Sequence, residues 1–153
     1  MREQITAPLT KERVAEVLRK MNAKFLQDSG GNLLLLVGTP FSGFVAITVV
    51  SVQEEGPVLV VEGSVLNLPP LDTKTLLEQA NTWNTKWKWP KVFLNGDELR
   101  FDYYLPLKEG VSEAQLKEFL GVALGSIQCL LDWLGGASES GEDLEETPRM
   151  VRA

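Results

Sequence analysis

The stretch LLLLVGTPFSGFVAITVVSVQEEGPVLVVEGSVL, residues 33–66, decides the fold of this chain. Runs of leucine, valine and other β-branched residues alternate in it with turn sequences that contain glycine and proline. Runs of this composition and length are typical of β-strands. A further short run precedes the stretch, across a turn that contains two glycines. The pattern predicts an antiparallel meander of four strands, at Ala23–Gln27, Leu33–Val37, Phe44–Val52 and Val58–Leu66.

Helix signals flank this meander on both sides. Before it, Thr10 is a residue type favoured at helix N-caps, and it precedes apolar residues at the spacing of one helical face. These residues are Val14, Val17, Leu18 and Met21. After the meander, Asp72 is a second N-cap candidate, and Pro90 is expected to end that helix. The apolar face of the second helix comprises Leu76, Leu77, Ala80, Trp83 and, at its limit, Trp87.

Two more strands and a third helix complete the prediction. Lys91–Leu94 and Leu99–Leu105 flank a turn in which Asn95-Gly96 suits a type I′ hairpin. Ser112 and Gln115 then have the spacing of a capping box, which marks the start of a helix. The predicted fold class is therefore α+β, an antiparallel sheet with three packed helices in the order α-β-β-β-β-α-β-β-α.

The third helix has a wider apolar face than a helix needs when it packs on one side of a domain. Its core residues fill one arc, and Val122, Cys129 and Trp133 extend that arc to one flank. Two explanations stay open. Either a homodimer partner or a client protein covers the flank, or the helix sits in a concave sheet that wraps around it. For self-association the sequence therefore offers this flank or an exposed edge strand.

Length, composition and charge limit the classes to which the chain can belong. Its 153 residues suffice for one domain with a real core, and its apolar fraction of 44% is that of a globular protein. We expect an N-terminal arm at 1–9, one domain at 10–134 and a disordered acidic tail at 135–153. The net charge of −6 disfavours nucleic acid and anionic lipid as partners and favours a basic protein surface.

The composition also removes most catalytic and metal-binding chemistry. Without histidine the chain lacks the usual general base and a common metal ligand, and its single cysteine allows no internal disulfide. It contains no glycine-rich phosphate loop and no spaced set of aspartates. We therefore expect no enzyme, no cofactor and no metal. The absence of a signal-peptide pattern or a membrane-length apolar run leads us to expect a cytoplasmic protein that does not bind membranes.

The segment NTWNTKWKWPK, residues 81–91, contains three of the four tryptophans and three lysines. One interpretation is a surface for single-stranded nucleic acid, because bases stack on aromatic rings and lysines attract phosphates. Its residues would be Lys86, Trp87, Lys88, Trp89 and Lys91. The other interpretation is structural: the aromatic side chains lock a helix end onto the sheet, and the asparagine amides satisfy backbone groups there.

At this segment the sequence resembles the bacterial YbjN family. Family members share a helix that ends in Asn-x-Trp-Asn, a basic-aromatic link, Pro-Lys and two strands, and then a Gly-Val-Ser helix start. The matching residues are Asn81, Trp83, Asn84 and Pro90, with Gly110-Val111-Ser112 further on. The resemblance covers residues 10–134 and implies a fold like class I type III secretion chaperones, which are usually homodimers. The resemblance implies no catalytic residues. It implies structural roles for Asn81, Trp83, Asn84 and Pro90.

These features lead to one leading hypothesis. The chain is a non-enzymatic, cytoplasmic and homodimeric protein-binding module, a chaperone-like adaptor or regulator in a bacterial stress response. Its client would present a basic surface, such as that of a DNA-repair or other nucleic-acid-binding protein. The alternative is direct binding of single-stranded nucleic acid through the Trp/Lys segment 83–91.

Overall fold

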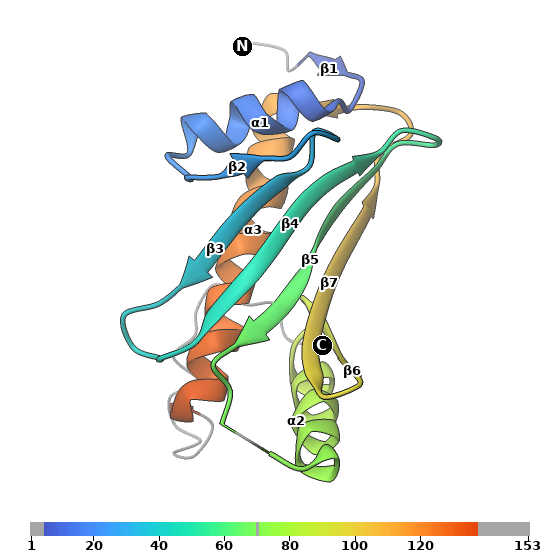
Figure 1. Ribbon diagram of the computed structural model, residues 1–153. Helices are drawn as coiled ribbons and strands as arrows, with labels where there is room; N and C mark the ends of the chain where they lie inside the picture. The colour runs from blue at the N-terminus through green and yellow to red at the C-terminus, as the bar shows by residue number, and fades with distance from the viewer. Residues whose placement is uncertain (1–4, 70, 138–153) are drawn as a thin grey trace.

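The computed structural model describes residues 5–69 and 71–137, and it confirms the α+β class with three helices and antiparallel sheets (Figure 1). The helices are α1 (Lys11–Lys20), α2 (Thr73–Lys86) and α3 (Glu113–Asp132), which continues into one wide π-type turn at Trp133–Ala137. The strands are β1 (Thr6–Ala7), β2 (Leu26–Gln27), β3 (Leu33–Gly38), β4 (Val45–Gln53), β5 (Val58–Leu66), β6 (Lys91–Asn95), β7 (Glu98–Pro106) and β8 (Val111–Ser112).

Six of these strands form one antiparallel sheet in the order β2-β3-β4-β5-β7-β6. The predicted meander is confirmed as β2 to β5, which are neighbours in chain order. The second hairpin joins the sheet through β7, which pairs with β5 and leaves β6 at the edge. The two-residue strands β1 and β8 form a separate ladder, which ties the N-terminal arm to the start of α3.

The core lies between the sheet and α3, which crosses behind β3 and β4 in the view of Figure 1. Side chains alternate along β3, so that Leu33, Leu35 and Val37 are buried and the residues between them are exposed. The buried residues of α3 are Leu116, Leu120, Ala123, Ser126, Ile127, Leu130 and Leu131. By length and composition alone, Glu113–Gly136 is apolar enough to cross a membrane, and it is the one such helix in the described part of the chain. Here that apolar character supplies the core of the domain.

The helices begin at the residues that the sequence predicts. Thr10 accepts a hydrogen bond from the backbone amide three residues later at 3.2 Å, and Asp72 does the same at 2.8 Å. The Ser112 hydroxyl accepts from the Gln115 amide, and the Gln115 side chain accepts from the Ser112 amide, which completes the predicted capping box. These bonds satisfy amides that a helix leaves without an internal partner.

The first strand of the meander is shorter than predicted. The sequence indicated Ala23–Gln27, but only Leu26–Gln27 pairs with β3. The chain turns at Asn22, which has a positive φ of 60°, and Phe25 packs beneath the Arg19 guanidinium of α1 at 5.4 Å. Contact with α1 therefore replaces sheet pairing at the start of this segment.

The turn of the second hairpin also differs from the prediction. Asn95 pairs with Glu98, so the loop residues are Gly96 and Asp97 instead of Asn95 and Gly96. Of the two, Gly96 alone has a positive φ, of 65°. A type I′ turn needs a positive φ at both central residues, whereas a type II′ turn needs it only at the first. The predicted type I′ turn is therefore wrong, and glycine at position 96 fits the type II′ pattern.

Candidate functional site

The face of the sheet that points away from α3 is apolar on β3 and β4. No described helix lies over this face in Figure 1. Its residues form three cross-strand pairs, Leu34–Val49, Leu36–Ile47 and Val45–Leu66, which we call the apolar patch. Leu36 is 74% exposed, and the other five residues are exposed or half-buried. Contiguous exposed apolar residues on a folded domain mark interaction surfaces, so the apolar patch is the candidate functional site.

The sequence itself contains a signal for the apolar patch. Leu33–Val37 is apolar at every position, and Val45–Val50 is apolar at every position except Thr48, which is buried. A strand with one face in solvent alternates apolar and polar residues, whereas a strand buried on both faces is continuously apolar. The continuity of these runs therefore predicts not only strands but also a cover on their second face.

Charged residues border the apolar patch on the side of β5 and β7. Glu62 lies directly opposite Asp102, and two acids in such a cross-strand pair repel each other. Two contacts offset this repulsion: the Tyr104 hydroxyl donates to Glu62 at 3.0 Å, and the Lys91 ammonium lies 3.3 Å from Asp102. The hydrogen bond to Glu62, followed by burial and then by the charges of Glu62 and Asp102, raises the pKa of Tyr104. The border of the patch therefore carries an acidic pair, of which Asp102 is 14% exposed and is paired with Lys91.

The two edges of the sheet differ in how they are closed. At the β6 edge the Asn84 side chain accepts from the Val92 amide at 3.0 Å and donates to the Val92 carbonyl at 2.8 Å, as a neighbouring strand would. At the opposite edge β2 pairs only with Leu33 and Leu34, so no described strand lies beside residues 35–38. Open strand edges can pair with another chain. This open edge adjoins the apolar patch at Leu36.

The family-signature residues hold the end of α2 against β6. The Trp83 indole nitrogen donates to the Pro90 carbonyl at 2.8 Å, and the peptide bond before Pro90 is cis. Asn84 makes the two bonds to β6 described above. Asn81 is exposed, and its carbonyl accepts a hydrogen bond from the Thr85 hydroxyl at 2.7 Å. The contacts of Trp83, Asn84 and Pro90 connect α2 to the start of β6, whereas the bond to the Asn81 carbonyl lies within α2 and does not involve the Asn81 side chain. A structural role for Asn81 stays a prediction.

The structure separates the tryptophans of the segment 83–91. Trp87 is buried, with its ring centroid 5.5 Å from that of Trp83, so its predicted availability for base stacking is wrong. Trp87 is buried because it lies four residues after Trp83 and continues the buried side of α2 by one turn. Trp89 is 38% exposed and stands edge-on to Tyr103 at 5.5 Å. One exposed ring therefore remains where the nucleic-acid interpretation needs several.

The lysines of the same segment also differ in their surroundings. Lys86 and Lys88 are exposed, and no described residue forms an ion pair with either. Lys91 is paired with Asp102 and lies over the Phe93 ring at 5.3 Å. The basic surface at the end of α2 is thus formed by two lysines.

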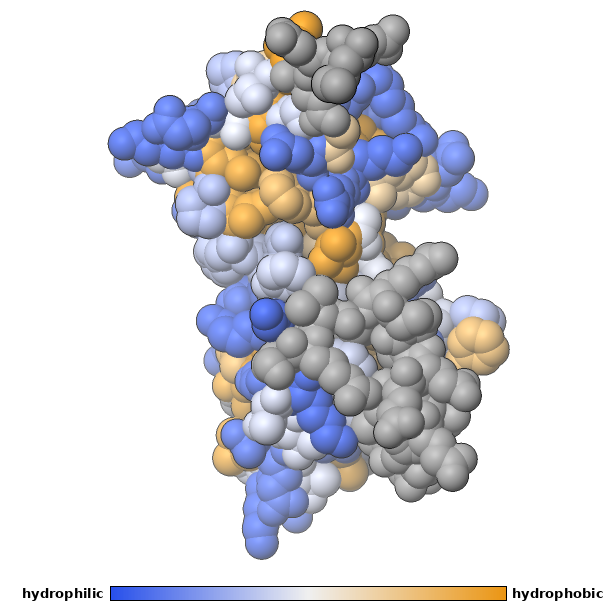
Figure 2. All heavy atoms as spheres, turned by 180° about the vertical axis from the view of Figure 1, so that it is seen from behind, coloured by the Kyte–Doolittle hydropathy of each residue, from blue (hydrophilic) through white to orange (hydrophobic). Residues whose placement is uncertain are grey.

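The predicted flank of α3 is partly covered within the chain itself. Trp133 is 5% exposed, and its ring centroid lies 5.6 Å from that of Trp83, so it belongs to the core and not to a dimer surface as predicted. Val122 and Cys129 are half-buried, and burial, followed by the charge of Asp132, raises the pKa of the Cys129 thiol. Figure 2 shows the side on which α3 lies, where hydrophilic residues interrupt the hydrophobic areas outside the grey atoms. A dimer role for Val122 and Cys129 stays a prediction.

The described residues, 5–69 and 71–137, contain no group of three or more His, Cys, Asp or Glu side chains that could hold a metal ion.

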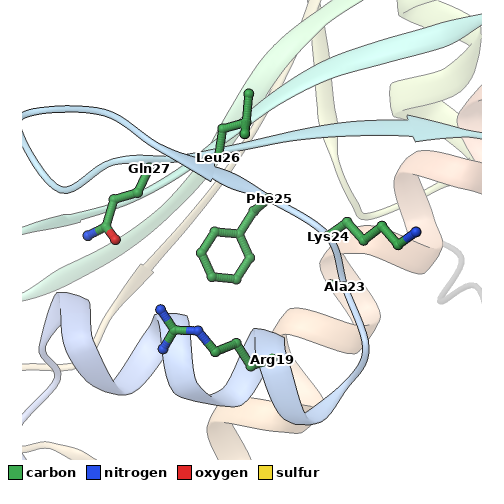
Figure 3. A pocket seen from close by; sticks show the side chains of 6 residues that line it. All are labelled: Arg19, Ala23, Lys24, Phe25, Leu26 and Gln27. Carbon is green, nitrogen blue, oxygen red and sulfur yellow. The ribbon is translucent and has the colours of Figure 1, made fainter.

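An open hollow of about 490 Å³ lies beside α1 and β2, lined by Arg19, Ala23, Lys24, Phe25, Leu26 and Gln27. In Figure 3 the Phe25 ring points toward Arg19, and Leu26 points to the other side of the strand. The lining offers two cations but no nucleophile or acid–base pair, so it supports no catalytic role.

Comparisons with known proteins agree with this fold. The sequence matches the YbjN family model, described as "Putative bacterial sensory transduction regulator", over residues 10–136. The crystal structure of YbjN from E. coli, described as a putative transcription regulator, has a TM-score of 0.59 at 12% sequence identity. The likeness covers 90% of this chain and 96% of that chain. No curated protein matches the sequence significantly. Because the family model spans most of the chain, this protein belongs to the YbjN family.

Proposed function

We propose that this chain is a non-enzymatic regulator that acts by binding another protein on the apolar patch. One observation supports this most strongly: β3 and β4 are apolar on both faces, and α3 covers only one of them. Burial of apolar surface contributes roughly 25 cal/mol per Å², so a partner that covers the patch gains binding free energy from it. Membership of a family described as regulators is consistent with this role.

The client in this proposal is a protein with a basic surface. The chain carries a net charge of −6, and the acidic pair Glu62 and Asp102 lies next to the apolar patch. Opposite charges at the border of an interface speed association and select the partner. A DNA-repair or other nucleic-acid-binding protein in the cytoplasm of a stressed bacterium fits this description. Its binding should weaken as salt shortens the Debye length.

The proposal includes a homodimer. The open edge of β3 supports self-association, because residues 35–38 have no described strand beside them and Leu36, within that segment, is exposed. Sedimentation velocity of the full chain over a range of concentrations tests this. We expect a dimer, and a monomer at all concentrations would remove the homodimer from the proposal while leaving client binding open.

Affinity capture with matched variants tests the binding role. Tagged full-length protein would be recovered from nuclease-treated lysate of its own bacterium, in native form and as Leu36→Asp and Leu77→Asp. Leu77 is the matched control, since it is 52% exposed on α2 and lies outside the apolar patch. We expect one dominant partner with the native chain and with Leu77→Asp, and its loss with Leu36→Asp. Equal recovery by all three forms would contradict the proposed surface.

A further inference from the structure

Lys86, Lys88 and Trp89 form a basic and aromatic surface at the C-terminal end of α2. Both lysines are exposed, and among the described residues neither has an ion-pair partner, unlike the nearby Lys91. Trp89 is the most exposed of the four tryptophans, at 38%. Positions 86–89 therefore offer two positive charges and one accessible apolar ring, which together suit an acidic segment with an apolar residue within it.

An acidic segment of the same chain follows α3, which ends close to α2. The contact between Trp133 and Trp83, with centroids 5.6 Å apart, sets the end of α3 beside the last turns of α2. After Ala137 the sequence continues for 16 residues, which include Glu139, Glu142, Asp143, Glu145 and Glu146. An extended chain advances roughly 3.3 Å per residue, so 142–146 can lie anywhere within about 16–30 Å of Ala137. This reach is sufficient for the end of α2.

We propose that the acidic segment 139–146 binds this surface of its own chain. Leu144, with acids on both sides of it, is the residue suited to contact Trp89, and those acids are suited to face Lys86 and Lys88. Single exposed ion pairs are weak, but attachment to the same chain raises the effective concentration of the segment to the millimolar range. The segment thereby neutralises the two lysines at the end of α2. This inference does not depend on the proposed client binding.

Acrylamide quenching of tryptophan fluorescence tests the proposal on the full chain. Trp83, Trp87 and Trp133 are buried, so a neutral quencher reports mainly on Trp89. We expect the quenching constant to rise roughly twofold when the acids at 142, 143, 145 and 146 are replaced by their amides, because the segment no longer covers the ring. Native protein in 1 M salt, where the Debye length is about 3 Å, should reach the same value.

A matched control removes four acids from the opposite end of the molecule. It carries Glu12→Gln, Glu54→Gln, Glu55→Gln and Glu109→Gln, all of exposed residues. These residues lie near α1 and the β4–β5 turn, as shown by the Lys11–Glu54 ion pair and by the bond from the Leu107 amide to the Pro57 carbonyl. We expect no change in quenching. An equal rise in the control would show a general effect of charge and would overturn the proposal.

Changing the lysines completes the test. Lys86→Gln with Lys88→Gln should raise the quenching constant as much as the amide substitutions at 142, 143, 145 and 146, which make the neutral-segment variant. Combining both sets of changes should raise the quenching constant no further. That non-additivity is expected of two groups that act through one contact. Quenching that is the same in the native chain and in the neutral-segment variant at low salt would overturn the proposal.

Discussion

Replacing Trp83 by phenylalanine tests whether the end of α2 is held as described. Trp83 is fully buried, donates to the Pro90 carbonyl at 2.8 Å and packs against Trp87 and Trp133. Phenylalanine keeps a buried ring but leaves that carbonyl without this donor, which costs about 1–3 kcal/mol. The smaller ring also loses apolar contact worth about 1 kcal/mol. We expect the free energy of unfolding to fall by about 3 kcal/mol, a large share of the roughly 5–15 kcal/mol of a typical domain.

Urea unfolding followed by far-UV circular dichroism measures this effect without relying on the altered tryptophans. With a slope of about 2 kcal/mol per M, the midpoint should move down by about 1.5 M. Trp89→Phe is the matched control, because it makes the same chemical change at a residue that is 38% exposed. We expect it to change the free energy by less than about 0.5 kcal/mol, as surface changes usually do. Equal shifts for the two variants would refute the reasoning.

Three further changes test the backbone and the helix starts. Gly63→Ala would place a Cβ against the Ile47 carbonyl oxygen, so the midpoint of thermal unfolding should fall by more than about 5 °C. Gly43→Ala, with open space around it, should leave the midpoint nearly unchanged. Ser112→Ala removes the capping box of α3 and should lower the free energy of unfolding by about 1 kcal/mol in urea titrations; no loss would contradict the role of the cap. The hydrogen bonds that the Asp72 carboxylate accepts at the start of α2 lower its pKa below 3.8 in the folded state. The advantage of the native chain over Asp72→Ala should therefore be present above pH 3.8 and be lost as pH falls through that lowered pKa; urea midpoints that differ equally at every pH would contradict this.

Local signals in the sequence predicted much of the fold. The Ser112–Gln115 capping box and the Asp72 cap depend only on residues three positions apart, so one sequence suffices to find them. The position of β7 between β5 and β6 depends on pairing between distant segments, which local patterns do not specify. The order of the elements was therefore predictable, but their arrangement in the sheet was not.

The candidate site shows the same limit. Helical periodicity correctly placed Trp133 on the flank of the apolar face of α3. It could not show that Trp83 of the neighbouring helix α2 covers this side chain. The two explanations open from the sequence were a second chain and a concave sheet, and neither named α2 as the cover of Trp133. The burial of Trp87 is a local matter, because it lies four residues after Trp83 and so continues the buried side of α2. The apolar patch was predictable in principle, since the continuous run Leu33–Val37 indicates strands covered on both faces.

Cross-linking from a defined position would locate the partner surface in cells. A photo-reactive amino acid would replace Leu36, the most exposed residue of the apolar patch, in the full chain. The same group at Leu77, on α2, and at Val122, on the flank of α3, provides the comparison. We predict a cross-linked product with a protein other than this chain from position 36, and no such product from positions 77 and 122. Cross-links from position 122 without any from position 36 would contradict the apolar patch as the binding surface.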